Sequence, residues 1–330
     1  MTVQEVKNII QQNSFINRYK TVLSVIAKII IALGLLTYII FSVNVQEILN
    51  AVKGANIYLI AAAFLLSFIN VYLQFYKWKL TANAILQEHH NSKIWLSLFY
   101  GFSAGVFTPA RIGEYFGRSI VFKNKSLLQV TLATLLDKLF LLLIVAFIGS
   151  ISSLLFIHYH YQISFYLTLS LFIVVFLLFY LIGLMIFNDE FWDNVLFAKL
   201  KHSMKLHWLF EKIKVFQKLD KKYATKMFIV STLFYICFIL QYALLVIAFS
   251  NQSRFINYIW AGNLVMFAKT IIPPVSFGEL GIREGASIFF ITQIGESAST
   301  GFNASIFLFF INVLIPSLVG LTLLLKKSDD

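Results

Sequence analysis

The sequence ISFYLTLSLFIVVFLLFYLIGLMIF occupies residues 163–187 and contains no charged side chain. A helix needs roughly 20 apolar residues to cross the hydrocarbon core of a bilayer, which is about 30 Å thick, so this stretch is long enough to span it. Of all residues, 59% are hydrophobic and only 13% are charged, about half the charged share of a soluble domain. We therefore predict an all-α integral membrane protein.

Further apolar runs lie on both sides of this stretch, at residues 22–43, 57–76, 126–157, 228–250 and 304–325. The formal net charge of +12 comes from Lys and Arg that cluster between the runs. This distribution is typical of the positive-inside pattern of membrane proteins and argues against nucleic acid as a partner. Lys77 and Lys79 are interpreted as cytoplasmic residues at the end of run 57–76, and residues 44–56 as an external loop.

The insert at about 188–226 carries nine Lys and five acidic residues and is the strongest cytoplasmic signal. With the insert inside, both chain termini fall in the cytoplasm, and the expected location is the cytoplasmic (inner) membrane. We treat residues 1–330 as a single polytopic domain.

Two apolar stretches end at prolines, and the first of them, with 14 residues, is too short to cross the membrane. Residues 94–107 stop before Pro109, and residues 256–272 stop at Pro273 and Pro274. Each is predicted to form a re-entrant helical hairpin. The Arg and Lys that follow the first stretch return it to the cytoplasm, and residues 284–294 are interpreted as returning the second to the outside. The expected fold has about six full spans and two hairpins, or eight or so hydrophobic segments.

The two hairpins share a motif, Pro-x-x-x-Gly-Glu-x-x-x-Arg. The first copy uses Pro109, Gly113, Glu114 and Arg118, and the second uses Pro274, Gly278, Glu279 and Arg283. Since the hairpins enter from opposite sides, the pattern predicts an inverted-topology repeat, with repeat 1 at about 57–157 and repeat 2 at about 228–325. Substrate sites of such proteins lie near the bilayer midplane, where broken helices meet.

The charged residues of these segments are the candidate site. Guanidinium groups bind phosphate through two donors, so Arg111, Arg118 and Arg283 are candidate ligands of a lipid phosphate. The alternative is that they only neutralise Glu114, Glu279 or Glu284. Lys269 either joins this anion site or extends toward the membrane surface. Asp137 and Lys138 are each expected to pair with a hairpin residue.

The motif blocks resemble the flippase-like membrane domain of lysylphosphatidylglycerol synthases. The matching stretches are GVFTPARIGEYFGR at 105–118 and PPVSFGELGIREGA at 273–286, which includes Gly281, and more weakly TLLDKL at 134–139. The resemblance implies that a lipid with a polar headgroup is moved between leaflets, by a flippase or a scramblase-like transporter. The synthases carry a soluble aminoacyl-transferase domain after the membrane part. Here the chain ends three residues after Lys327, so we do not expect an enzyme.

Several lipids fit a phosphate site: a phospholipid, an aminoacylated lipid, or a polyprenyl phosphate or lipid-linked sugar. A different class of function is a membrane enzyme acting on a lipid headgroup, and another is a scaffold that recruits a separate glycosyltransferase or synthase through the insert. We expect no cofactor and no metal, because Cys237 is the single cysteine, the histidines lack metal-ligand spacing, and no nucleotide-binding or hydrolase motif occurs.

Overall fold

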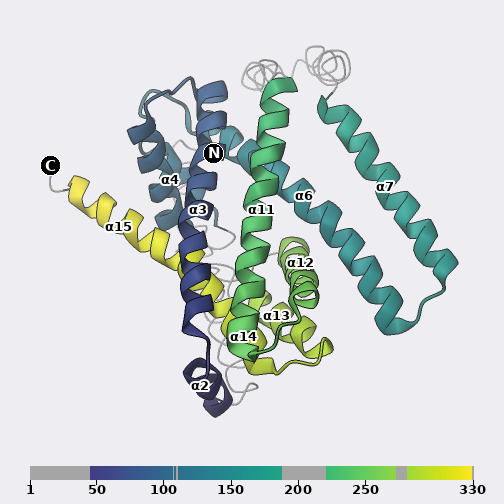
Figure 1. Ribbon diagram of the computed structural model, residues 1–330. Coiled ribbons are helices and arrows are strands. Elements are labelled where there is room, and N and C mark those ends of the chain that lie inside the picture. Colours follow the sequence, from purple (N-terminus) through teal and green to yellow (C-terminus); the bar gives the residue numbers. More distant parts are fainter. Residues whose placement is uncertain (1–44, 107, 109–110, 188–220, 273–280, 329–330) are drawn as a thin grey trace, which may run out of the picture.

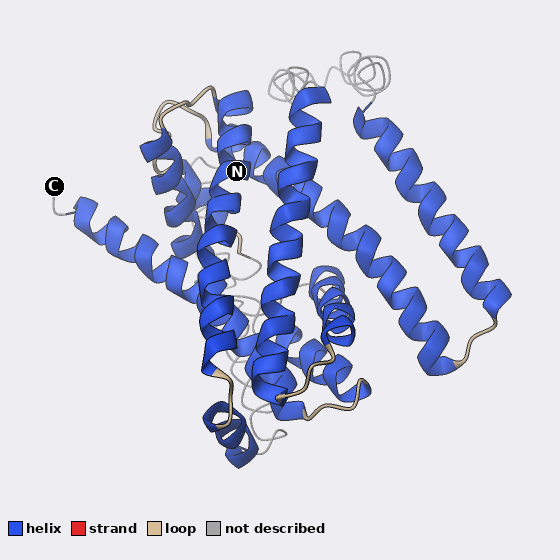
Figure 2. Ribbon diagram, viewed as in Figure 1, coloured by secondary structure: helices blue, strands red, loops and turns tan. Residues whose placement is uncertain are grey.

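The computed structural model describes residues 45–106, 108, 111–187, 221–272 and 281–328. Within these ranges the regular elements are helices, and no strand is found (Figure 2). Helical segments long and apolar enough to cross a membrane are Ile57–Leu86, Leu127–Tyr161, Phe165–Leu184, Lys221–Ser250 and Ala298–Lys326. The expected all-α membrane architecture is confirmed. The first expected span, at 22–43, and most of the insert lie outside the described residues.

Figure 1 shows the helices in chain order. The first half of the chain contains α2 (Val45–Lys53), α3 (Ile57–Thr81), the π-helical turn η1 (Ala82–Leu86), α4 (Asn91–Val106), α5 (Gly113–Ser119), α6 (Leu127–Tyr161) and α7 (Phe165–Phe187). The second half contains α11 (Lys221–Ser250), α12 (Phe255–Ile271), α13 (Ile282–Gln293), α14 (Ala298–Phe309), the π-helical turn η4 (Phe310–Leu314) and α15 (Ile315–Ser328). Polar caps mark where helices begin: Ser126 accepts from the backbone N–H of Gln129 at the start of α6.

Helices α3 and α11 lie side by side and antiparallel at the centre of the molecule (Figure 1). At one end of the pair, the backbone N–H of Asn56 donates to the carbonyl of Ala248 over 2.9 Å. At the other end, the hydroxyls of Thr81 and Tyr223 are 2.9 Å apart. These contacts fix which helix ends lie together.

Three buried amides connect this central pair to η4. The amide of Asn70 on α3 donates to Gln241 on α11 over 3.0 Å and to Asn312 on η4 over 2.9 Å. Asn312 in turn donates to Gln241. Polar side chains inside a bilayer need such partners because the surrounding hydrocarbon offers none.

Two shorter helix pairs pack around the centre. The first hairpin is α4–α5, which follows the end of α3 and packs on α15 and α6. The second hairpin is α12–α13, which follows the end of α11 and packs on α14, α6 and α11. Because α3 and α11 are antiparallel, the two hairpins begin at opposite ends of the central pair (Figure 1).

Two regions differ from the sequence-based expectation. Residues 44–56, expected to be an external loop, contain α2, whose apolar residues Ile48, Leu49 and Val52 recur at helical spacing and which packs on α14. Helix α3 was expected to end at residue 76, yet it continues through η1 to Leu86 because the following sequence is again apolar.

Candidate functional site

Helix α5 lies unusually close to α4 because glycines face the α4 backbone. A Cβ atom at Gly113 would lie 2.1 Å from the carbonyl oxygen of Ala104, and one at Gly117 would lie 2.3 Å from that of Tyr100. No other residue type fits at either position without moving one of the two helices. This small-x-x-x-small spacing is the arrangement that lets membrane helices approach closely.

Glycines of α4 make room for the charged side chains of α5. A Cβ atom at Gly101 would come within 2.7 Å of the Cγ atom of Arg118, and one at Gly105 would lie 3.4 Å from the Cβ atom of Glu114. The side chains of Glu114 and Arg118 therefore lie across the glycine face of α4. The close packing of α5 on α4 therefore fixes the direction in which these two charged side chains point.

The turn between α4 and α5 is held by Thr108. Its hydroxyl accepts from the backbone N–H of Gly113 over 2.7 Å. Arg111, in the same turn, has φ of 55°, a left-handed conformation that side chains other than glycine rarely adopt. The turn thus places the Arg111 side chain beside Glu114, where their charged groups are 3.5 Å apart.

Charged residues from α3, the α4–α5 turn, α5 and α6 meet at one place, which we term the first charge cluster. Arg118 donates to Glu114 over 2.6 Å and to Asp137 over 3.1 Å. Lys138 donates to the other oxygen of Glu114 over 2.7 Å. The cluster consists of Lys77, Arg111, Glu114, Arg118, Asp137 and Lys138.

Lys77 is the member that sequence reasoning misplaced. It was expected at the cytoplasmic end of a span, but only 4% of it is exposed and its ammonium lies 3.8 Å from Asp137. The signal that could have placed it is the apolar sequence after it, which extends the helix well past this position. Trp78, the next residue, covers the guanidinium of Arg118 with its ring at 4.2 Å.

Among the residues that the structure describes, the first charge cluster holds more cations than acids. Four cationic side chains meet the two carboxylates of Glu114 and Asp137. Even with Arg111 set aside, three cations remain against two acids. Glu114 and Arg118 are each 2% exposed, but the Lys138 side chain is 36% exposed. The side of the cluster at Glu114 and Arg118 is therefore buried. The side at Lys138 is exposed and positively charged, and we term it the open edge.

The second hairpin holds a smaller group, the second charge cluster, made of Arg283, Glu284 and Ser305. Arg283 donates to Glu284 over 2.5 Å and to the hydroxyl of Ser305 on α14 over 3.1 Å. The other oxygen of Glu284 accepts from the backbone N–H of Gly281, whose φ of 94° favours glycine. Arg283 and Glu284 are 1% and 0% exposed. Within the described part of the chain, this cluster pairs one cation with one acid.

A family model described as the lysylphosphatidylglycerol synthase TM region matches residues 25–320. The chain belongs to this family. A search of curated proteins finds no match. Membership of the lysylphosphatidylglycerol synthase TM region family agrees with the five apolar helical segments found within the described ranges. It makes the chain a multi-pass membrane protein with a lipid-related role. The family corresponds to the membrane part of these synthases, not to their catalytic domain.

The other candidate residues of this family member are placed as follows. Lys269 lies in the last turn of α12, with its ammonium 5.9 Å from the ring of Phe238. Among the residues that the structure describes, no group of His, Cys, Asp and Glu could hold a metal ion. The expected hairpin residues Pro109, Pro273, Pro274 and Gly278, together with Glu279, lie outside the described residues.

Proposed function

We propose that the protein moves a lipid with an anionic, phosphate-bearing headgroup between the leaflets of the cytoplasmic membrane, with the first charge cluster holding the headgroup. The observation that carries this proposal is the positive excess of that cluster together with its open edge at Lys138. A net positive charge held within hydrocarbon is costly. A phosphate would supply the missing negative charge and accept charge-assisted hydrogen bonds.

The charge balance also favours one class of lipid over another. An aminoacylated headgroup carries an added ammonium, which would meet the cations of the open edge at close range. Like charges at such a distance in a low dielectric repel strongly. We therefore propose a net anionic headgroup, such as that of phosphatidylglycerol, rather than an aminoacylated one.

The helix arrangement supports transport rather than headgroup chemistry. The α4–α5 and α12–α13 hairpins begin at opposite ends of the central pair, as the halves of an inverted-topology repeat would. We propose that both hairpins are re-entrant and that movement of one half against the other exposes the headgroup to either side while the tails stay in lipid.

A vesicle assay tests this function. Purified protein is reconstituted into phosphatidylcholine vesicles that contain labelled phosphatidylglycerol, and the loss of leaflet asymmetry is timed. We expect Lys138→Gln to slow transfer about tenfold or more, since a hydrogen bond to a charged group contributes about 1.5–3 kcal/mol. The matched control is Lys93→Gln, which removes a lysine that pairs with Glu88 outside the cluster.

Two results would reject the proposal. One is a transfer rate in the wild type no higher than in protein-free vesicles, and the other is equal rates for the two lysine variants. Labelled aminoacylated phosphatidylglycerol is the comparison arm, and faster transfer of this lipid would reject the anionic assignment. Mass spectrometry of co-purified lipid separates phosphatidylglycerol from a polyprenyl phosphate, which shares the same phosphate chemistry.

A further inference from the structure

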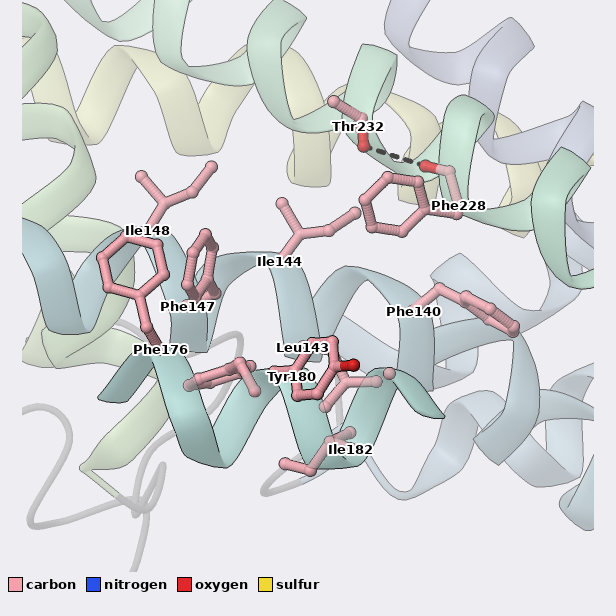
Figure 3. Close-up of a pocket in the computed structure, with 12 residues that line it drawn as sticks. Phe140, Leu143, Ile144, Phe147, Ile148, Phe176, Tyr180, Ile182, Phe228 and Thr232 are labelled. Atoms are coloured by element: carbon pink, nitrogen blue, oxygen red, sulfur yellow. Dashed lines mark hydrogen bonds between the residues drawn. The ribbon is translucent and has the colours of Figure 1, made fainter. Parts of the chain in front are cut away.

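An apolar cavity of about 460 Å³ lies between α6, α7 and α11. Figure 3 shows side chains of α6, such as Ile144 and Phe147, facing Phe176 of α7 and Phe228 of α11. The volume falls in the range of small-molecule sites, roughly 300–1,000 Å³. The hydroxyl of Thr232 at its wall already donates to the carbonyl of Phe228 over 2.9 Å. The lining therefore favours an apolar ligand.

The cavity begins one helical turn from the first charge cluster. Asp137, Phe140 and Ile144 recur at spacings of three and four along α6 and so share one side of that helix. Asp137 belongs to the cluster, whereas Phe140 and Ile144 line the cavity.

The length of the cavity matches one hydrocarbon leaflet. Its α6 wall runs from Phe140 to Ile148, which is about 12 Å at the rise of an α-helix. One leaflet is about 15 Å deep, half of a core of about 30 Å. A phospholipid needs a polar site for its headgroup and an apolar site for its acyl chains. The first charge cluster and the adjacent cavity provide one of each.

We propose that this cavity binds one acyl chain of the lipid whose headgroup lies at the first charge cluster. The inference rests on the proposed function for the identity of the headgroup, but it assigns a separate site, made by α6, α7 and α11. Both Phe176 and Phe179 of α7 pack on Phe147, with ring centroids 5.4 and 5.1 Å apart. These rings form the wall that the chain would contact.

Gly183 provides a way to fill the cavity without disturbing its walls. It lines the cavity from α7, and a Cβ atom added to it would meet nothing within 4 Å. Gly183→Trp would therefore place an indole ring in the cavity, where we propose that the acyl chain binds. Leu177→Trp is the matched control, because Leu177 lies on the same helix, is 57% exposed and does not line the cavity.

The test uses phosphatidylglycerol with a photoactivatable group near the end of one acyl chain, in phosphatidylcholine vesicles that contain the wild-type protein. We expect the label on residues that line the cavity. Gly183→Trp should lower this labelling about tenfold, the change expected if two CH₂ groups of the chain lose their burial. Leu177→Trp should leave it unchanged.

The outcomes separate this inference from the proposed function. Label spread over the exposed side of α7, equal in both variants, would show annular lipid only and would overturn the inference even if transfer between leaflets is observed. Label in the cavity without transfer would support the acyl-chain site and reject transport. The positions labelled in the wild-type protein test the inference without any variant, so it stays testable if Gly183→Trp fails to fold.

Discussion

The two charge clusters occupy corresponding places in the two hairpins but differ in balance and access. In the first, Arg118 lies between two acids, and two lysines and a second arginine join it. In the second, Arg283 pairs with Glu284, the next residue along the chain, and with a serine. The first cluster has an open edge, whereas both charged residues of the second are almost fully buried.

We interpret this difference as one between the proposed binding site and a structural pair. A buried ion pair whose charges cancel has no need of a ligand, and its removal leaves a lone charge in hydrocarbon. A cluster with surplus cations at an accessible edge is completed by an anion from outside. We infer that the first hairpin binds the headgroup and that the second hairpin uses its arginine mainly to hold α13 against α14.

The largest expected effect lies in the second charge cluster. Arg283→Met leaves the carboxylate of Glu284 buried without its cation, so the free energy of unfolding should fall by about 3–5 kcal/mol. Unfolding of the purified protein in detergent micelles by added denaturant measures this. A loss below about 1 kcal/mol would contradict a structural role for the pair.

A second variant tests the charge excess of the first cluster. Asp137→Asn removes one of its two acids, leaves Lys77 and Arg118 in further excess, and should destabilise the protein by about 2–4 kcal/mol. Adding Lys77→Met should restore much of this loss, because it removes one surplus cation. A double-mutant cycle measures the coupling, and strictly additive losses would speak against a shared cluster.

Much of this organisation could be predicted from sequence, and the failures have physical causes. Apolar runs and proline positions indicate the spans and hairpins, because membrane thickness and backbone hydrogen bonding restrict both. The four-residue spacing of Glu114 and Arg118 indicates their pairing. Each of these patterns involves residues that are close together in the sequence.

The misplaced residues depend on contacts between distant segments. Lys77 follows an apolar run and looks like a residue at the membrane surface, yet its partner Asp137 lies on another helix. Likewise, Glu284 was among the expected partners of Arg283, but the hydrogen bond from Arg283 to Ser305 on α14 could not be predicted from the motif. Charge patterns along the chain do not reveal which surfaces the packed helices bring together.

A third prediction compares glycines of the two hairpins. Gly117→Ala places a methyl group against the carbonyl of Tyr100 on α4 and should destabilise the protein by about 1–3 kcal/mol. Gly285→Ala, in α13, meets nothing within 4 Å and should be neutral or stabilising by up to about 1 kcal/mol. The same unfolding assay serves both. Equal effects would show that close glycine packing does not distinguish the first hairpin.

The smallest effect concerns the loop that leads into the first hairpin. Burial raises the pKa of the Glu88 carboxyl, but hydrogen bonds from His90 and Lys93 outweigh it and lower the pKa from 4.5 to about 2. A lowered pKa in the folded chain means that this stabilisation is present above pH 4.5 and is lost as the pH falls toward 2.

Thermal unfolding followed from pH 6 to pH 3 measures this loss. The wild type should lose slightly more stability than Glu88→Gln, by less than about 1 kcal/mol, because the partners of Glu88 are exposed to solvent. Identical pH profiles for the two proteins would show that the carboxylate does not stabilise the loop.

The most direct test of a headgroup site in the first charge cluster is the binding of a soluble short-chain phosphatidylglycerol to the purified protein. Lys138→Glu reverses one charge at the open edge, and Lys93→Glu makes the same change in net charge outside the cluster. We predict that Lys138→Glu weakens binding at least about tenfold, while Lys93→Glu binds like the wild type. Equal affinities for all three proteins would contradict the account.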